Sequence, residues 1–124
     1  NDWLCWHKKN DGLSFSEFEL AWTNFGKNTR HISHHWGGEK KQHVTMKPVA
    51  VCIWGIKLTE GKIVFDPFLG SGSTLIACEQ TDRQCYGLEL DPLYVDVICK
   101  RWQTLTGQMP ILESTGEAHD FMVQ

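Results

Sequence analysis

The chain has 124 residues, of which 41% are hydrophobic and 22% charged, and its formal net charge is -3. These values fit a single globular domain over residues 1–124 and exclude an intrinsically disordered chain. No segment approaches the roughly 18 consecutive apolar residues that span a bilayer, and none resembles a signal peptide, so we expect a cytoplasmic protein with no membrane partner.

The first part of the chain combines a strand pattern with a long polar loop. It begins on Asn1 rather than methionine, with tryptophans close behind, and we expect it to be a fragment of a longer protein. Apolar and polar residues alternate from Phe18 to Trp22, which predicts a half-buried strand. Residues Gly26 to Gln42 show no apolar period and predict a loop. Loops of that length are usually functional or mobile.

This loop is also the basic part of the chain. Five lysines and arginines lie between Gly26 and Pro48 against the single acid Glu39, whereas acidic residues dominate after Pro48. The charge pattern favours contact with a phosphate backbone, and it fits a solvated surface loop equally well. Three histidines at positions 31, 34 and 35 suggest zinc, but without a cysteine pair we expect solvated histidines and no metal site.

The second half alternates helices and strands. We predict a helix at Val49–Trp54 behind Pro48, a strand at Lys62–Asp66, a helix at Ser73–Gln80, a strand at Cys85–Leu90 and a helix from Asp91-Pro92 to Gly107. Both strands are short continuous apolar runs, typical of strands buried on both faces. The order implies a parallel sheet in an α/β sandwich. The polar tail over residues 108–124 is expected to fray.

A cofactor loop is expected between the two strands. Gly70 and Gly72 allow a sharp turn and close ligand approach, and Glu89 lies where an acid accepts hydrogen bonds from ribose hydroxyls. A phosphate-binding P-loop would need a lysine, and a dinucleotide fingerprint would need glycine where Leu75 stands. A carboxylate at Asp66 repels a pyrophosphate but suits the ammonium of a methionine group. S-adenosylmethionine carries both that ammonium and a ribose.

Three segments resemble one family. Asp66-Pro-Phe-Leu-Gly-Ser-Gly-Ser-Thr74 with Tyr86-Gly-Leu-Glu-Leu-Asp-Pro-Leu-Tyr94 looks like the cofactor half of bacterial and phage DNA methylases that modify adenine N-6 or cytosine N-4. His43-Val-Thr-Met-Lys-Pro-Val49 resembles their His-Pro-Thr-Gln-Lys-Pro-Val segment, departing at the second and fourth positions. Residues 18–23 resemble a strand before their recognition loop. The resemblance covers about residues 14–107 and implies an incomplete Rossmann-like methyltransferase sandwich, present as its C-terminal part.

The resemblance also implies roles for individual residues. Those expected to hold S-adenosylmethionine are Asp66, Pro67, Phe68, Gly70, Ser71, Gly72, Ser73, Thr74, Glu89, Asp91, Lys47 and Pro48. Within the basic loop over residues 26–42, in the place of a target-recognition region, Arg30, Lys40 and Lys41 are candidates for phosphate contacts on double-stranded DNA. Trp36 fits base stacking and void filling equally well.

The family's catalytic motif is absent. Its members use an Asp/Asn/Ser-Pro-Pro-aromatic sequence at the target base, and this chain has no Pro-Pro pair. We therefore assign no catalytic residue, and expect the motif to be lost or supplied by an N-terminal portion or partner chain. Two alternatives stay open: a non-catalytic subunit that completes a partner's site, and a methyltransferase for small molecules. The target base and recognition sequence are not determined by the residues.

Overall fold

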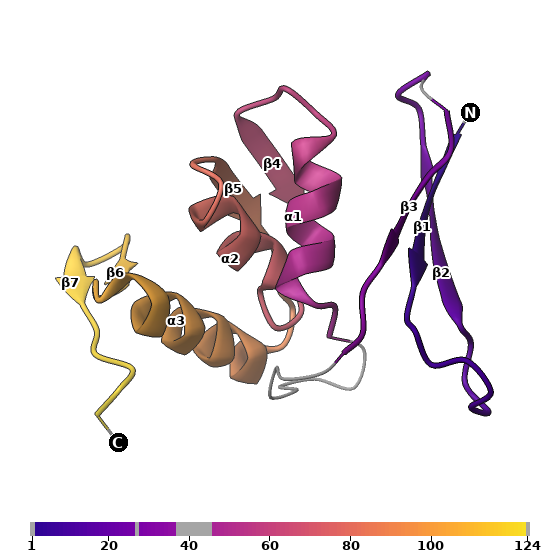
Figure 1. Cartoon of the computed structure of the whole chain (residues 1–124). Coiled ribbons are helices and arrows are strands. Elements are labelled where there is room, and N and C mark those ends of the chain that lie inside the picture. The colour runs from indigo at the N-terminus through magenta and orange to yellow at the C-terminus, as the bar shows by residue number, and fades with distance from the viewer. Residues whose placement is uncertain (1, 27, 37–45, 124) are drawn as a thin grey trace.

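The computed structural model describes residues 2–26, 28–36 and 46–123. Seven strands and three helices follow one another along this part of the chain (Figure 1). In order they are β1 (Asp2–His7), β2 (Phe18–Thr23), β3 (Arg30–Ser33), α1 (Val49–Lys57), β4 (Ile63–Asp66), α2 (Ser73–Glu79), β5 (Gln84–Gly87), α3 (Pro92–Thr106), β6 (Ile111–Leu112) and β7 (Glu117–Ala118). No helix in these ranges is long and apolar enough to cross a membrane.

The N-terminal strands form one sheet in the order β2-β1-β3. β1 runs antiparallel to β2, with Trp6 opposite Glu19, and parallel to β3. The expectation of an irregular loop over residues 26–42 is wrong at β3. This strand has mostly exposed side chains and no apolar period. It is formed by backbone pairing with the edge of β1, which a hydrophobic pattern does not reveal. The predicted DNA contacts Lys40 and Lys41 lie outside the described residues.

The second sheet consists of the parallel strands β4 and β5, as expected. α2 is the crossover between them and packs against β5, and α1 packs against α2, so both helices lie on the same side of the sheet (Figure 1). The prediction that both faces of these strands are buried is wrong. Ile63, Phe65 and Tyr86 are 64%, 62% and 53% exposed. We call these three residues the open sheet face.

α3 begins and ends as its sequence predicts. The Asp91 carboxylate accepts a hydrogen bond from the Leu93 N–H, Pro92 occupies the first turn, and Gly107 closes the helix at a φ of 72°. The tail does not simply fray, since β6 and β7 form a hairpin. The buried Gln103 amide then donates to the Asp120 carboxylate at 2.6 Å, which ties residues after the hairpin to α3.

Candidate cofactor-binding site

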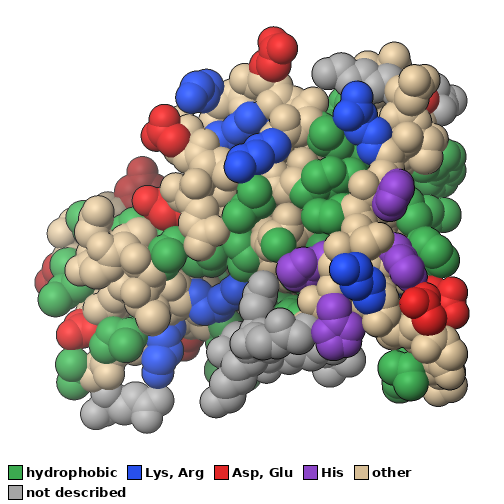
Figure 2. Space-filling view, in the orientation of Figure 1, with side chains coloured by type: hydrophobic (Ala, Val, Ile, Leu, Met, Phe, Trp, Pro, Cys, Tyr) green, Lys and Arg blue, Asp and Glu red, His purple; other side chains and the backbone are tan. Residues whose placement is uncertain are grey.

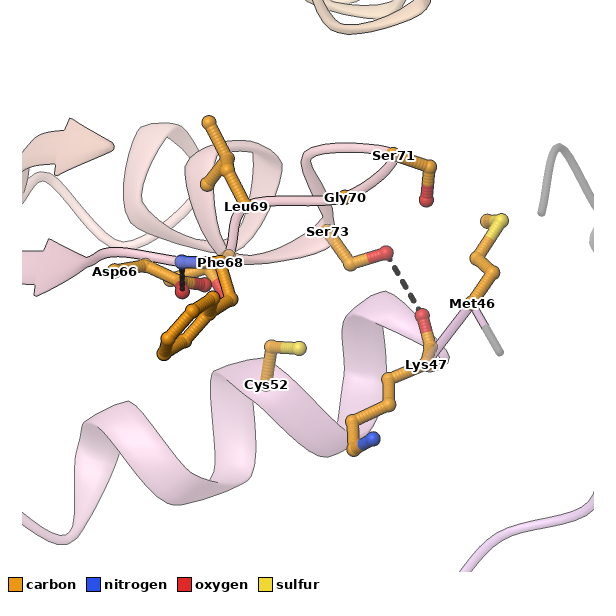
Figure 3. Close-up of a pocket in the computed structure, with 10 residues that line it drawn as sticks. Met46, Lys47, Cys52, Asp66, Phe68, Leu69, Gly70, Ser71 and Ser73 are labelled. Carbon is orange, nitrogen blue, oxygen red and sulfur yellow. Dashed lines mark hydrogen bonds between the residues drawn. The ribbon is translucent and has the colours of Figure 1, made fainter. Parts of the chain in front are cut away.

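A cavity of about 170 Å³ lies at the carboxyl end of β4, between the loop that follows this strand and the start of α1 (Figure 3). Typical ligand pockets measure about 300–1,000 Å³, so this cavity matches one end of a ligand. The residues that line it are Met46, Lys47, Cys52, Asp66, Phe68, Leu69, Gly70, Ser71, Ser73 and Thr74. Most of the expected cofactor residues are therefore brought together, at the sheet edge where α/β folds bind ligands.

Two glycines give the loop its shape. Gly70 and Gly72 have φ angles of 56° and 81°, in the left-handed region that other residues rarely adopt. A Cβ on Gly72 would lie 3.0 Å from the Ile98 Cγ1 of α3. Gly72 is not among the residues that line the cavity. It starts α2 and lets α3 pack closely beneath the loop.

Glu89 connects the loop to the chain after β5. Its Oε2 accepts from the Gly70 N–H at 2.6 Å and its Oε1 from the Asp91 N–H at 3.0 Å. The two bonds fix the carboxylate beside the loop, between Gly70 and the start of α3. Since β5 ends at Gly87, Glu89 lies two residues beyond the strand, whereas the sequence predicted it within a strand over Cys85–Leu90.

Asp66 ends β4 and faces the cavity with Phe68 (Figure 3). Its Oδ1 accepts from the Phe68 N–H at 3.0 Å, which fixes the carboxylate at the mouth of the loop. The Phe68 side chain is 87% exposed. The site thus combines a fixed negative charge, backbone amides and an available aromatic ring. This donor set suits a ligand with a cationic end.

The Lys47-Pro48 segment forms the opposite wall. The Lys47 carbonyl accepts a hydrogen bond of 2.8 Å from the Ser73 hydroxyl, the dashed line across the cavity in Figure 3. Its ammonium instead pairs with the Glu19 carboxylate at 3.2 Å. Pro48 is fully buried and does not line the cavity. Lys47 therefore contributes to this wall while its charge is held by β2.

Arg101 was not identified from the sequence. Its Nη1 donates to the Ser71 carbonyl at 2.5 Å, and lies 3.3 Å from the Ser71 hydroxyl and 3.5 Å from that of Ser73. The guanidinium thus supports the loop from α3. No local motif marks it. The sequence shows only that Arg101 lies on the same face of α3 as Tyr94, two helical turns further along.

The predicted DNA residues that the structure describes lie apart from this cavity. Arg30 begins β3 and is exposed, and Trp36 is half-buried three residues after the strand ends. Figure 2 shows histidine side chains gathered over β3 and the chain beside it. The Trp6 indole N–H donates to the His34 carbonyl at 2.8 Å, which fastens this part of the chain to β1.

The sequence matches the DNA methylase family of N6 and N4 enzymes over residues 2–100. Type II methyltransferase M.Cfr9I of Citrobacter freundii is 51% identical over 43 residues, which are 35% of this chain and 14% of that protein. Type II methyltransferase M.HpaI of Haemophilus parainfluenzae is 33% identical over 70 residues, 55% of this chain and 22% of the relative. The matching segments thus span less than a quarter of these relatives.

Solved structures show the same fold. The M1.HpyAVI–SAM complex superposes with a TM-score of 0.65 at 24% identity, covering 82% of this chain and 61% of that one. TTHA0409 of Thermus thermophilus, complexed with S-adenosyl-L-methionine, gives a TM-score of 0.56 at 21% identity, covering 82% and 52%. The α/β arrangement is therefore that of a methyltransferase sandwich with part of it missing.

Proposed function

Since the chain belongs to the N6/N4 DNA methylase family, we propose that it is the cofactor-binding part of an S-adenosylmethionine-dependent DNA amino-methyltransferase. One observation carries the proposal. The cavity at the end of β4 places a fixed carboxylate, two serine hydroxyls and the backbone of a glycine loop around a space that fits one end of a ligand.

The Asp66 carboxylate would hold the ammonium of the methionine end. One of its oxygens is occupied by the Phe68 N–H, and the other can accept from the ligand. Ser71 and Ser73 add hydroxyls, and Phe68, Gly70, Thr74 and Lys47 complete the wall. When bound, S-adenosylmethionine supplies an electrophilic methyl group. The negative charge of Asp66 in this site favours a cationic ligand over a phosphate.

The remaining cofactor residues would act outside this cavity. Glu89, held beside the loop by the Gly70 and Asp91 N–H groups, would accept hydrogen bonds from the ribose hydroxyls. Asp91, two residues further on, caps α3 and would lie near the adenine. Pro67, Pro48 and Gly72 shape the backbone rather than contact the ligand through polar atoms.

Double-stranded DNA is the proposed substrate, with methyl transfer to the exocyclic amine of adenine or cytosine and no covalent enzyme–base intermediate. Arg30 on β3 would contact a phosphate, and Trp36 would stack on a base or support the segment. Lys40 and Lys41 are proposed as phosphate contacts on charge alone, since they lie outside the described residues.

The acceptor side of the reaction would come from another segment or polypeptide. A Pro-Pro-aromatic motif is absent from these 124 residues, and the open sheet face exposes the apolar residues Ile63, Phe65 and Tyr86. Parallel sheets are normally covered on both faces, so this surface suits the portion that carries the motif. A non-catalytic subunit that completes a partner's site is the second candidate function, favoured by the same two observations.

The test uses the purified 124-residue chain with S-adenosylmethionine. Calorimetry should detect weak binding, which Asp66→Asn reduces. Incubation with labelled cofactor and duplex DNA should give no methylated DNA. Absence of binding at millimolar cofactor would contradict the proposed site, and turnover by the chain alone would contradict the proposed need for a further segment. Restored turnover with a polypeptide that carries the Pro-Pro-aromatic motif would favour an enzyme over a non-catalytic subunit.

A further inference from the structure

A carboxylate on β2 lies between two lysines from different parts of the chain. The Oε1 of Glu19 is 3.0 Å from the Lys8 ammonium and its Oε2 is 3.2 Å from that of Lys47. Burial of Glu19 acts to raise its pKa, but the hydrogen bonds from Lys8 and Lys47 outweigh this and hold the pKa below its usual value. The charged form of Glu19 is thus the form that the fold stabilises.

The hairpin holds this carboxylate in a defined place. Glu19 lies directly opposite Trp6 in the β1–β2 register, and Trp6 is 4% exposed. Lys8 follows β1, its ammonium lies 5.7 Å from the Trp6 ring centroid, and its backbone N–H donates to the Glu17 carbonyl at 2.8 Å. Glu19 therefore presents a fixed acceptor to whatever segment approaches β2.

That segment is a wall of the cofactor cavity. Lys47 is held at both ends, through its ammonium by Glu19 on β2 and through its carbonyl by the Ser73 hydroxyl at the start of α2. The buried Pro48 follows directly, and Met46 and Cys52 line the cavity beside it. A shift of Lys47 would therefore move a wall of the cavity.

We propose that Glu19 is a positioning residue that holds the Lys47-Pro48 segment against the cofactor loop and so couples the β1–β2 hairpin to the cavity. Its relevance to S-adenosylmethionine rests on the proposed function. The Glu19–Lys47 ion pair and the Ser73–Lys47 hydrogen bond together connect the β2-β1-β3 sheet to the start of α2. A plain surface ion pair, in contrast, would stabilise the hairpin slightly and leave the cavity unchanged.

The test compares Glu19→Gln with Glu17→Gln in the full chain. Glu17 lies on the same hairpin, but it is bonded to Lys8 through its backbone carbonyl, which the substitution retains. The first readout is the dissociation constant for S-adenosylmethionine. The second is the rate at which N-ethylmaleimide alkylates Cys52, followed by mass spectrometry of the Cys52 peptide without cofactor.

Glu19→Gln should raise both values about three- to fivefold, the size expected for one exposed ion pair that acts on the site. Glu17→Gln should leave both unchanged. In a Lys47→Met background, Glu19→Gln should have no further effect on Cys52, because its partner is already gone. If Glu19→Gln lowers the far-UV circular dichroism signal, Glu19→Asp replaces it and should give smaller shifts in the same direction.

Equal affinities and equal Cys52 rates for the wild type and Glu19→Gln would overturn the proposal, as would additive effects in the Lys47→Met background. A chain that binds no S-adenosylmethionine would contradict the proposed function. The Cys52 rates would still decide whether Glu19 positions the segment.

Discussion

The Glu89 carboxylate and the Gly70 backbone N–H, nineteen residues apart, are joined by a hydrogen bond of 2.6 Å. The same carboxylate accepts from the Asp91 N–H. Glu89 therefore orders the loop, in addition to its expected role as a contact to the ligand. Its position is fixed before any ligand arrives, which lowers the ordering cost of binding.

Replacing Glu89 with glutamine should disturb the loop even though the shape is retained. Both oxygens accept from backbone N–H groups, so the amide nitrogen of glutamine must face a donor. Bonds of this charged kind contribute about 1.5–3 kcal/mol, and the dissociation constant for S-adenosylmethionine should rise about tenfold or more. Calorimetry measures this, with Glu60→Gln, at an exposed position before β4, as the control. An unchanged affinity would show that the two bonds do not support the site.

Asp66→Asn tests the contribution of the Asp66 negative charge to cofactor binding. Asparagine keeps an oxygen that can accept from the Phe68 N–H, so the loop should stay folded while attraction for the ammonium is lost. We expect the dissociation constant for S-adenosylmethionine to rise about tenfold, corresponding to about 1.4 kcal/mol. Binding of 5′-methylthioadenosine, which lacks the amino-acid end, should not change. Equal losses for both ligands would mean that Asp66 does not face the methionine end.

Gly72→Ala and Gly107→Ala separate backbone strain from a steric clash. Both glycines have left-handed φ angles, 81° and 72°, but only Gly72 faces a side chain, since a Cβ there would lie 3.0 Å from the Ile98 Cγ1. Each alanine should cost about 1–2 kcal/mol of folding free energy from strain. Gly72→Ala should cost about 1–3 kcal/mol more from overpacking. Urea unfolding measures both. In an Ile98→Ala background, which removes the Cγ1 and Cγ2 atoms, the cost of Gly72→Ala should fall to about that of Gly107→Ala, whereas the cost of Gly107→Ala should not change.

Local signals predicted the elements around the site. Asp91-Pro92 and Gly107 mark the ends of α3 because caps depend on one or two residues. The loop after β4 was expected from Gly70 and Gly72, and both have left-handed φ angles. Arg101 was missed because its contact with Ser71 depends on how α3 packs under the loop.

The N-terminal sheet was predicted less well. β2 was expected from its alternation, but Phe18, Leu20 and Trp22, assigned to its buried face, are 47%, 64% and 56% exposed. β3 has no apolar period, since it is defined by pairing with β1. Alternation predicts which side chains share one face of a strand, whereas their exposure depends on whether another element covers that face.

The open sheet face should make the isolated chain bind hydrophobic probes. Contiguous exposed apolar surface of this kind marks an interaction site or an aggregation hazard, and Phe65 and Ile63 are both more than half exposed. The Phe65→Ser variant should lower the fluorescence of bound anilinonaphthalene sulfonate and delay elution on size exclusion if the chain self-associates. Its melting temperature should hardly change, since an exposed side chain contributes little burial. Leu13→Ser, an exposed leucine on the β1–β2 connection, is the control.

Cys85 should make stability fall at alkaline pH. Burial raises the pKa of its thiol from 9.0 to about 12, with the nearby Cys78 adding to the shift, and burial also raises the pKa of Cys78. Above about pH 9 the unfolded chain loses the Cys85 proton while the folded chain keeps it. The stabilisation is thus complete below pH 9 and decreases as the pH rises toward 12. Cys85→Ala should flatten the dependence of the unfolding free energy on pH between about 9 and 11, measured by urea titration, whatever its effect on absolute stability. A slope equal to that of the wild type would show that the thiol ionises as freely in the folded chain as in the unfolded one.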